Sequence, residues 1–398
     1  MNWLAKIKEN RLVLRIRKST AFARIWQRFQ DPTPKYFADP AMDEYRDAEP
    51  VIMEWPAGLR KPKVGLVRDV DPYPRWTKYE RFFQNNGFTY ELFDINRSDW
   101  LEKAQQYDVI VGLFSNAPSR LDQIRKKIHF LEEYMHIPCY PASRHLQLYE
   151  DKKLESYFCN IYDFPFARTN VFYDLQEALA YSKTARYPLI SKQDPSSGSM
   201  GVEKVDNEKQ ARRIIRQAFS QQGRKTHLLY LRQKDYVYFQ EFVPNDGHDI
   251  RVVICGNYAY GYMRKVPQGD FRASGMNIIV HGHLPKEAVL IARKLYRALG
   301  SPMLAVDFVR GLDGSYTIIE FSPFYQVNKP SELHVNEEKG AYVFDSEDTY
   351  HHEKQLIWIH ELALDQFFKN DFLPRAVIPT DCDRNPDRQH LEVLAERR

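Results

Sequence analysis

The chain has 398 residues, enough for two or three domains that each bury a core of their own. Its hydrophobic content of 43% and charged content of 28% are ordinary for a soluble globular protein, and no apolar run reaches the ~18 residues that a membrane-spanning helix needs. Four widely spaced cysteines without a CxxC pair argue against structural zinc and a disulfide framework. Together with the lack of a secretory signal, they favour a reducing, cytoplasmic compartment.

The net charge of +4 is unevenly distributed. Residues 1–30 hold eight basic residues and one acidic residue, whereas the rest of the chain holds 49 basic and 52 acidic residues. In this basic arm Phe22, Ile25, Trp26 and Phe29 follow helical spacing, which predicts an amphipathic helix. Such a helix can lie on an anionic membrane surface, but docking on its own domain or on a partner subunit of a homo-oligomer is the favoured alternative. The nearly neutral remainder argues against a nucleic-acid partner.

Residues 1–61 therefore form an arm and a linker rich in Pro and Asp, and a different pattern occupies residues 62–144. Strands are expected at Val64–Val67, Thr89–Phe93 and Asp108–Leu113, and helices at Trp76–Asn86, Ser98–Gln106 and Arg120–Met135. This alternation predicts a small parallel sheet with helices on both faces. A dinucleotide-binding domain gets no support, because the GxGxxG motif is absent.

From about residue 145 the strands lengthen, and Tyr and Phe become frequent, which predicts a mostly antiparallel α+β domain over residues 145–330. The expected helices are Leu175–Lys183, Asn207–Gln221 and Lys286–Ala298. The expected strands are Tyr187–Lys192, Val202–Val205, Tyr236–Phe242, Asp249–Cys255, Tyr258–Lys265, Met303–Arg310 and Ser315–Phe321. An extension over residues 331–398 is expected to begin irregularly, to include one helix near Lys354–Phe368 and to end in a loosely ordered stretch.

The most informative segment is the hairpin formed by the last two of these strands. Asp313–Gly314 between them is a strong signal for a two-residue turn. This turn makes Asp307 and Glu320 direct cross-strand partners and places Ser322 on the same face. The opposite, core-facing side carries Leu304, Val306, Phe308, Ile319 and Phe321.

The pairing of Asp307 with Glu320 predicts a cation site. Two carboxylates with Cβ atoms roughly 5 Å apart repel each other, and a divalent cation would relieve the repulsion. Mg²⁺ prefers one or two carboxylates together with phosphate oxygens, so the first hypothesis is a magnesium–nucleotide site. The alternative is a solvated acidic pair in a shifted register.

Lys192 ends a predicted strand, and a loop rich in Ser and Gly follows it up to Gly201. This arrangement suits phosphate, because small residues let backbone N–H groups approach oxygen atoms and the lysine supplies positive charge. The loop is not a Walker motif, which needs GxxxxGK[ST] before a helix. An ordinary hairpin loop is the alternative.

A second hairpin turns at Gly256–Asn257, which places Asp249 opposite Arg264 and Arg251 opposite Tyr262. Opposite charges across strands are also common on solvated faces, so this pattern alone leaves both readings open. Downstream, Arg272 lies in a Gly-flanked loop from which it could clamp a phosphate or a carboxylate. Other chemistries lack a motif, since no HExxH or GxSxG accompanies the histidines His281, His283, His351 and His352.

Together and in this order, these pieces resemble the ATP-grasp superfamily, and within it the amino-acid ligases typified by the ribosomal-protein glutamate ligase RimK, with glutathione synthetase as a more distant relative. The resemblance covers about residues 145–323. It is carried by the stretches Gln240–Val243, Gly247–Arg251 and Gly269–Arg272 and by the hairpin with Asp307 and Glu320–Pro323. It implies a fold of α/β plus α+β type, in which an ATP-grasp domain follows a small Rossmann-like pre-ATP-grasp domain.

The resemblance also implies roles for individual residues. ATP would be bound by two lysines, a phosphate loop, a hinge that contacts adenine and one further acid, which are Lys152, Lys192, Ser197, Gly198, Ser199, Gly201, Glu241, Phe242, Val243 and Asp249. The residues implied to face phosphate or substrate are Arg251, Arg264 and Arg272, and the implied Mg²⁺ ligands are Asp307, Glu320 and Ser322.

The implied activity is an ATP- and Mg²⁺-dependent ligase that joins a small-molecule, peptide or glycan carboxylate to an amine through an acyl phosphate. Three departures from the family pattern bear on catalytic competence and substrate identity: Ser322 replaces Asn, Ala273–Ser274 replaces Ser-Asn after Arg272, and the Gly-Gly pair after this loop is absent. A non-catalytic nucleotide-binding scaffold or regulator is therefore the alternative. A kinase-like enzyme that leaves phosphate on its product ranks third.

Overall fold

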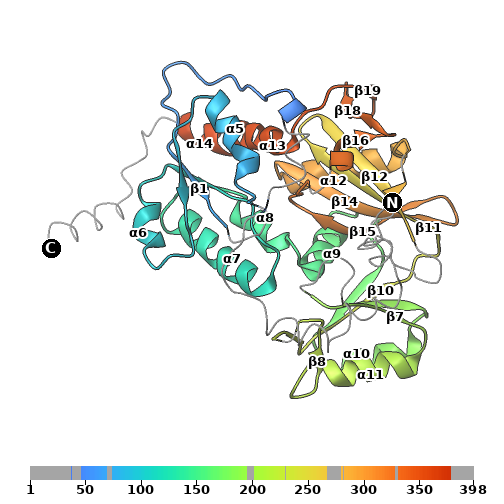
Figure 1. The fold of residues 1–398 in the computed structure, drawn as a ribbon. Coiled ribbons are helices and arrows are strands. Elements are labelled where there is room, and N and C mark those ends of the chain that lie inside the picture. The colour runs from blue at the N-terminus through green and yellow to red at the C-terminus, as the bar shows by residue number, and fades with distance from the viewer. Residues whose placement is uncertain are drawn as a thin grey trace, which may run out of the picture.

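The computed structural model describes residues 37, 46–69, 74–194, 201–228, 230–266, 279–280, 282–327 and 330–377 (Figure 1). The predicted arm helix and the end of the extension lie outside these residues. None of the described helices has the length and apolar character that a membrane span needs. The described cysteines, Cys139, Cys159 and Cys255, are free and buried.

The first sheet is parallel and has four strands in the order β2-β1-β3-β4. Its strands are β1 (Val64–Val67), β2 (Tyr90–Phe93), β3 (Val109–Val111) and β4 (Cys139–Tyr140). The helices between them are α5 (Thr77–Asn85), α6 (Trp100–Ala104) and α7 (Pro118–Glu133). β1 and β3 are short apolar runs that are buried on both faces, as strands in the middle of a parallel sheet are. The predicted α/β alternation is confirmed, and β4 is a strand that the prediction missed.

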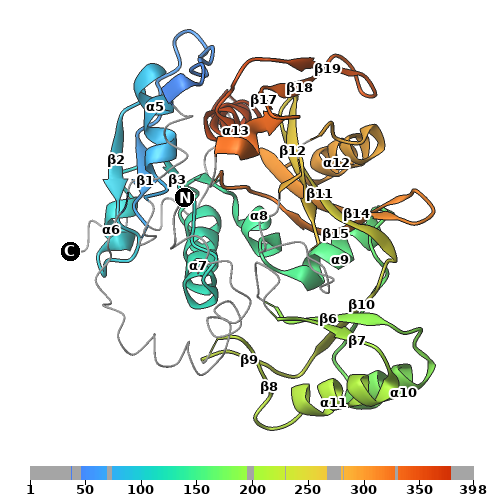
Figure 2. The same cartoon turned by 45° about the vertical axis from the view of Figure 1, so that its right-hand side comes forward.

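The second sheet is antiparallel, with the order β5-β10-β6-β7. Its strands are β5 (Thr169–Phe172), β6 (Leu189–Lys192), β7 (Val202–Val205) and β10 (Val237–Glu241). Helices α10 (Leu175–Thr184) and α11 (Glu208–Ala218) cover it, and a small hairpin of β8 (Arg224–Lys225) and β9 (Arg232–Gln233) lies beside it (Figure 2). α11 buries Ala211, Ile214, Ile215 and Ala218, which share one helical face, in a core that belongs to this sheet alone.

The third sheet has seven strands in the order β15-β14-β11-β12-β18-β19, with β13 also paired to β12. Its strands are β11 (Asn245–Cys255), β12 (Tyr258–Lys265), β13 (Ile279–Val280), β14 (Met303–Gly311), β15 (Tyr316–Ser322), β18 (Ala341–Phe344) and β19 (Tyr350–Glu353). Helix α12 (Lys286–Leu299) covers one face of this sheet. Helices α8 (Ser143–Leu148) and α9 (Lys152–Ile161) lead from the first sheet to the second, and α9 lies beside β15 (Figure 2).

The chain after β15 is more ordered than predicted. It forms the 3-10 helix η1 (Pro330–Leu333), a small hairpin of β16 (His334–Val335) and β17 (Glu338–Lys339), and the two strands that extend the third sheet. Helix α13 (Ile359–Phe367) follows, then the π-helix η2 (Phe368–Phe372) and helix α14 (Leu373–Val377). The irregular start expected for this extension is wrong, because the aromatic and apolar residues of β18 pack into the core of the third sheet.

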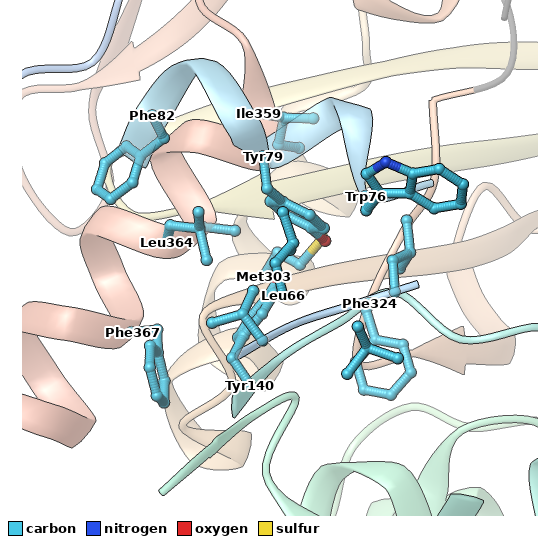
Figure 3. Packing of buried hydrophobic residues seen from close by; sticks show 14 of the residues in the cluster. Leu66, Trp76, Tyr79, Phe82, Tyr140, Met303, Phe324, Ile359, Leu364 and Phe367 are labelled. Carbon is cyan, nitrogen blue, oxygen red and sulfur yellow. The ribbon is translucent and has the colours of Figure 1, made fainter. Parts of the chain in front are cut away.

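α13 is buried between the first and third sheets in one shared apolar core (Figure 3). Tyr79 and Tyr140 come from the first sheet and its helix, Met303 from β14, and Ile359 and Phe367 from α13. The first and third sheets therefore share a core, in contrast to the second sheet.

Buried polar contacts reinforce this junction between α5 and α13. Arg81 donates to both oxygens of the buried Glu361, at 2.6 and 3.1 Å, and Glu361 also accepts from the Val51 N–H at 2.9 Å. Lys78 of α5 donates to the carbonyl of Val327, in the segment that follows β15. The extension thus fixes the exit of β15 relative to the first sheet.

Replacing Glu361 by Leu should lower the free energy of unfolding by about 3 kcal/mol, because Arg81 and the Val51 N–H would lose their buried partner. Urea denaturation of the variant and the wild type measures the difference. Glu338→Gln, which removes an exposed carboxylate paired with Lys354, is the control and should leave stability nearly unchanged. A loss for Glu361→Leu no larger than that of the control would contradict this account.

Candidate active site

The hairpin of β14 and β15 differs from the prediction at its turn. The Gly311 N–H donates to the Ser315 carbonyl at 2.8 Å and closes a three-residue loop, where a two-residue turn at Asp313–Gly314 was expected. Gly314, the last residue of this loop, has a positive φ of 87°, as such loops require. The pairing next to the turn is therefore shifted by one residue from the predicted register.

A β-bulge in β15 cancels this shift. Phe308 pairs with Ile318. The next pair is Asp307 with Glu320, so Ile319 is the extra residue of the bulge. Asp307 and Glu320 are thus cross-strand partners as predicted, although two departures from the expected geometry produce this result. The predicted core face is wrong at one position, because Ile318 is fully buried in the place expected for Ile319.

The bulge also connects the second and third sheets. The Ile319 carbonyl accepts a hydrogen bond from Nζ of Lys192 at 2.8 Å. Lys192 is the last residue of β6, as predicted, and it is buried. Burial lowers the pKa of Lys192 to about 8, although the nearby Glu320 carboxylate acts in the opposite direction.

Lys152 approaches the same strand from the first turn of α9. Asp151 caps this helix by accepting from the backbone N–H groups of the two residues after Lys152. Nζ of Lys152 lies 3.3 Å from Oε1 of Glu320, and the lysine is only 2% exposed, whereas the side chain of Glu320 is 36% exposed. Burial by itself would lower the pKa of Lys152, but Glu320 and other carboxylates raise it well above its ordinary value. Lys152 therefore stays positively charged beside Glu320.

Asp307 is held by two arginines of the neighbouring strands. Nε and Nη2 of Arg251 donate to its two oxygens, both at 2.7 Å, and Nη2 of Arg264 donates at 2.9 Å. Arg264 also donates to Asp249 at 2.6 Å. Burial would raise the pKa of Asp307, but the ion pairs with Arg251 and Arg264 outweigh it and hold the pKa well below its ordinary value. Burial raises the pKa of Asp249 to about 6, against the effect of Arg264.

The predicted cross-strand partners of this network are confirmed, since Asp249 pairs with Arg264 and Arg251 with Tyr262. The repulsion between Asp307 and Glu320 is relieved without a divalent cation, because arginines neutralise one carboxylate and a lysine the other, so the cation site stays a prediction. Arg264 is buried between two carboxylates, so it is placed to orient Asp307.

The predicted adenine hinge lies at a junction of sheets. Glu241 ends β10 of the second sheet, and Phe242 and Val243 lead to β11 of the third. The Glu241 N–H donates to the Arg168 carbonyl at 2.8 Å, and the Phe242 N–H to the Pro188 carbonyl at 3.4 Å, so the first two residues of this link are anchored.

Four predicted site residues, Ser197, Gly198, Ser199 and Arg272, lie outside the described residues. Gly201, at the end of the phosphate loop, has a positive φ of 80°, and a Cβ atom there would lie 3.0 Å from the side chain of Gln193. Glycine is therefore required where the loop returns to β7.

The sequence analysis missed three acidic residues around Lys152. Asp194 is buried and forms an ion pair with Lys153. Glu150 has a positive φ of 56° and an oxygen 3.4 Å from Nδ2 of Asn116, and burial raises its pKa to about 7. Glu155 is buried against β15. Its spacing of three residues from Lys152 is a signal that could have revealed it, since both share one helical face.

The residues of the hairpin fit a magnesium ion bound together with phosphate. No group of three or more His, Cys, Asp or Glu suited to a metal occurs in the described part of the chain, so the protein alone offers two carboxylates and a hydroxyl. This small set is what Mg²⁺ uses when phosphate oxygens and water complete its shell. Glu320 has solvent access, and Ser322 donates to the Phe324 carbonyl at 2.6 Å, which leaves its oxygen lone pairs available.

Comparisons with known proteins support the predicted resemblance. No protein-family profile matches the chain. The chain is 24% identical over 260 residues to the alpha-aminoadipate–LysW ligase LysX of Saccharolobus solfataricus, and the match covers 62% of this chain and 88% of the relative. The structure of the D-cycloserine synthetase DcsG has a TM-score of 0.50 at 15% identity, covering 76% of this chain and 99% of DcsG. A RimK domain protein from Sphaerobacter thermophilus has a TM-score of 0.45 at 15% identity, covering 65% and 90%.

The predicted ATP-grasp resemblance and the mixed fold are therefore confirmed. The predicted class of enzyme, a ligase, is also the class that the name of the relative from Saccharolobus solfataricus gives. The domain boundaries and the roles of the individual site residues stay predictions.

Asp307→Asn should lower the free energy of unfolding by about 3 kcal/mol at pH 7, because the buried Arg264 and the partly buried Arg251 would lose their shared carboxylate. A carboxylate with a lowered native pKa contributes its full stability above its unfolded pKa of 3.8 and loses it as the pH falls through the native value. Urea denaturation should therefore give a large difference from wild type at pH 7 that shrinks below pH 3.8. Asp313→Asn in the exposed turn is the control. An equal loss of unfolding free energy in both variants would contradict the stabilising role assigned to the ion pairs of Asp307.

Proposed function

We propose that the protein is an ATP- and Mg²⁺-dependent ligase that joins a carboxylate to an amine through an acyl-phosphate intermediate. The observation that carries this proposal is the convergence of Lys152, Lys192 and Glu320 on the bulged edge of β15, where the second and third sheets meet. Two buried cations beside a solvent-accessible carboxylate suit the triphosphate of ATP and a cation bound to it. The sequence match to a ligase and the ATP-grasp fold agree with this proposal.

The phosphates would be bound by the lysines. Lys192 and Lys152 supply positive charge, and the hydrogen bond of Lys192 to the Ile319 carbonyl is one that a phosphate oxygen can replace. The loop that ends at Gly201 would supply backbone N–H groups, and the link Glu241–Val243 would contact the adenine. Asp249, predicted to contact the nucleotide, is buried against Arg264, so it would act through this arginine.

Glu320, Ser322 and Asp307 would hold Mg²⁺, which neutralises phosphate charge when bound. Glu320 is the carboxylate with solvent access, so it would be the principal ligand. Asp307 can contribute only while it shares its oxygens with Arg251, whose side chain is 24% exposed and borders the site. Arg264 would position Asp307 without touching substrate.

The reaction needs positioning and charge neutralisation more than covalent participation by the protein. The carboxylate of one substrate attacks the γ-phosphorus of ATP, ADP leaves, and an acyl phosphate forms. The amine of the second substrate then attacks the acyl carbon, phosphate leaves with the bonding electrons, and the nitrogen loses a proton. Fixed cations such as Lys192 and Arg251 would stabilise the charge that shifts toward the departing oxygen atoms.

The substrates are proposed as classes. The relative named above acts, by its name, on alpha-aminoadipate and LysW. For this chain we infer a small-molecule, peptide or glycan carboxylate and an amine. A cytoplasmic location, with or without membrane contact through residues 1–30, accords with the free cysteines of the described chain.

The second candidate function is a nucleotide-binding protein without turnover. It is favoured by the engagement of both oxygens of Asp307 with arginines and by the hydroxyl of Ser322 where the family has an amide. This protein would bind ATP and release no ADP.

The ligase proposal predicts Mg²⁺-dependent ADP release with hydroxylamine as a surrogate amine, across a panel of amino acids, peptides and uronic-acid sugars. A hydroxamate with one class of carboxylate is the expected product, since hydroxylamine captures an acyl phosphate. Glu320→Gln should lower the rate by at least about 100-fold, because the principal ligand loses its charge. Glu177→Gln, at an exposed position of α10, is the control. Near-wild-type activity of Glu320→Gln would refute this site, and ATP binding without ADP release would favour the second candidate.

Nucleotide affinity should depend on pH through Lys192. With a pKa of about 8, this lysine is charged below pH 8 and becomes neutral above it, while phosphate binding favours the charged form. Calorimetric titration with a non-hydrolysable ATP analogue in EDTA should therefore give an affinity that is constant up to about pH 7 and falls above pH 8. Lys192→Ala should bind weakly at every pH. The same fall above pH 8 in this variant would assign the titration to another group.

A further inference from the structure

Glu155 is a buried carboxylate beside the candidate cation site, and no sequence motif includes it. Its side chain is on α9, three residues after Lys152, so the two side chains share one face of the helix. This face lies against β15, and Glu155 is only 1% exposed. Glu155 is therefore a buried acid close enough to the two buried lysines, Lys152 and Lys192, for their charges to act on it.

One oxygen of Glu155 is anchored to β15. Oε2 accepts a hydrogen bond from the Phe321 N–H at 3.1 Å. β15 is the edge strand of the third sheet; the outward N–H of Ile318 donates to the Pro165 carbonyl at 2.8 Å, and α9 supplies the acceptor for the N–H of Phe321. Phe321 lies between Glu320 and Ser322 in the sequence, so this bond holds the carboxyl group of Glu155 directly beside the candidate ligands.

The other oxygen of Glu155 is unused in the free protein. Oε1 is buried and has no hydrogen-bond partner among the described residues. A buried carboxylate oxygen without a donor is unfavourable, so a structural role alone gives no reason for an acid here. The charges of Lys152 and Lys192 act on Glu155, yet Lys152 lies at ion-pair distance from Glu320.

We propose that Glu155 is a positioning residue that takes over the ion pair of Lys152 when Glu320 turns to the bound cation. The inference rests on the proposed function, because it requires Glu320 to be a Mg²⁺ ligand. Drawing Glu320 away takes a carboxylate from ion-pair distance of the buried Lys152, which is unfavourable even though Glu150 and Asp194 also act on this lysine. Oε1 of Glu155 is the acceptor that keeps Lys152 neutralised and in place.

The charges around Glu155 are consistent with this exchange. In the free protein, burial raises the pKa of Glu155 well above its ordinary value, and repulsion from Glu320 raises it further, whereas Lys152 and Lys192 lower it. A cation on Glu320 removes the repulsion and leaves the two lysines. The ionised form of Glu155 is therefore favoured in the loaded site.

The test is Glu155→Gln, which keeps an acceptor for the Phe321 N–H and removes the charge. Calorimetric titration with a non-hydrolysable ATP analogue, in EDTA and at graded Mg²⁺ concentrations, separates nucleotide binding from the effect of the cation. In EDTA the affinity should stay within about twofold of wild type, while the Mg²⁺ concentration at half effect should rise about tenfold, because Lys152 now competes for Glu320. Glu177→Gln on the exposed face of α10 is the matched control and should match wild type in both conditions.

Thermal unfolding in EDTA shows whether the variants fold. If Glu155→Gln is unstable, Glu155→Met replaces it and should shift the Mg²⁺ dependence at least as far. A Mg²⁺ dependence within twofold of wild type would overturn the inference and leave the proposed function intact. Equal loss of affinity with and without Mg²⁺ would also overturn it, since that result indicates a general structural role. Wild-type protein that binds the analogue without any effect of Mg²⁺ would overturn both proposals.

Discussion

Two lysine charges buried at the edge of β15 determine what surrounds them. Lys152 comes from α9 and Lys192 from the second sheet, and neither position tolerates an isolated charge. Glu320 supplies the opposite charge beside Lys152, and the bulge at Ile319 supplies a carbonyl to Lys192. The bulge that looks like an irregularity of the hairpin is therefore the feature that brings the second sheet to the third.

A separate set of charges occupies the neighbouring strands of the third sheet. Asp249, Arg264, Asp307 and Arg251 form a continuous chain of ion pairs across β11, β12 and β14. Both oxygens of Asp307 are thus bound by arginines, whereas Glu320 on the edge strand has solvent access and lies at ion-pair distance from Lys152. The two carboxylates that the sequence places side by side differ in this respect, because Asp307 on the interior strand β14 accepts from arginines of β11 and β12, whereas Glu320 on the edge strand β15 lies beside α9.

The fold could be predicted where hydrophobic periodicity and the order of motifs indicate it. The length of the turn, the β-bulge and the contacts between distant segments could not be predicted. Lys192 was found because a lysine that ends a strand before a small-residue loop is a local pattern. The pairing of Asp307 with Glu320 was predicted from a turn that has a different length, and the bulge at Ile319 that restores the register leaves no mark in the sequence. The spacing of Glu155 from Lys152 places both on one helical face, but the contact of this face with β15 joins distant segments and was not predictable from the local sequence.

The candidate active site lies where units with separate apolar cores meet. The first and third sheets share one apolar core with α13, whereas the second sheet has a core of its own. The second sheet is joined to the rest through short links such as Phe242–Val243 and through contacts like the Lys192 hydrogen bond to β15. A unit with a separate core can move relative to its neighbours at little cost, since few buried contacts must break. Under the proposed function, a phosphate that replaces the Ile319 carbonyl at Lys192 would act directly on a contact between the two units, so binding of the nucleotide and the position of the second sheet would be coupled through this lysine.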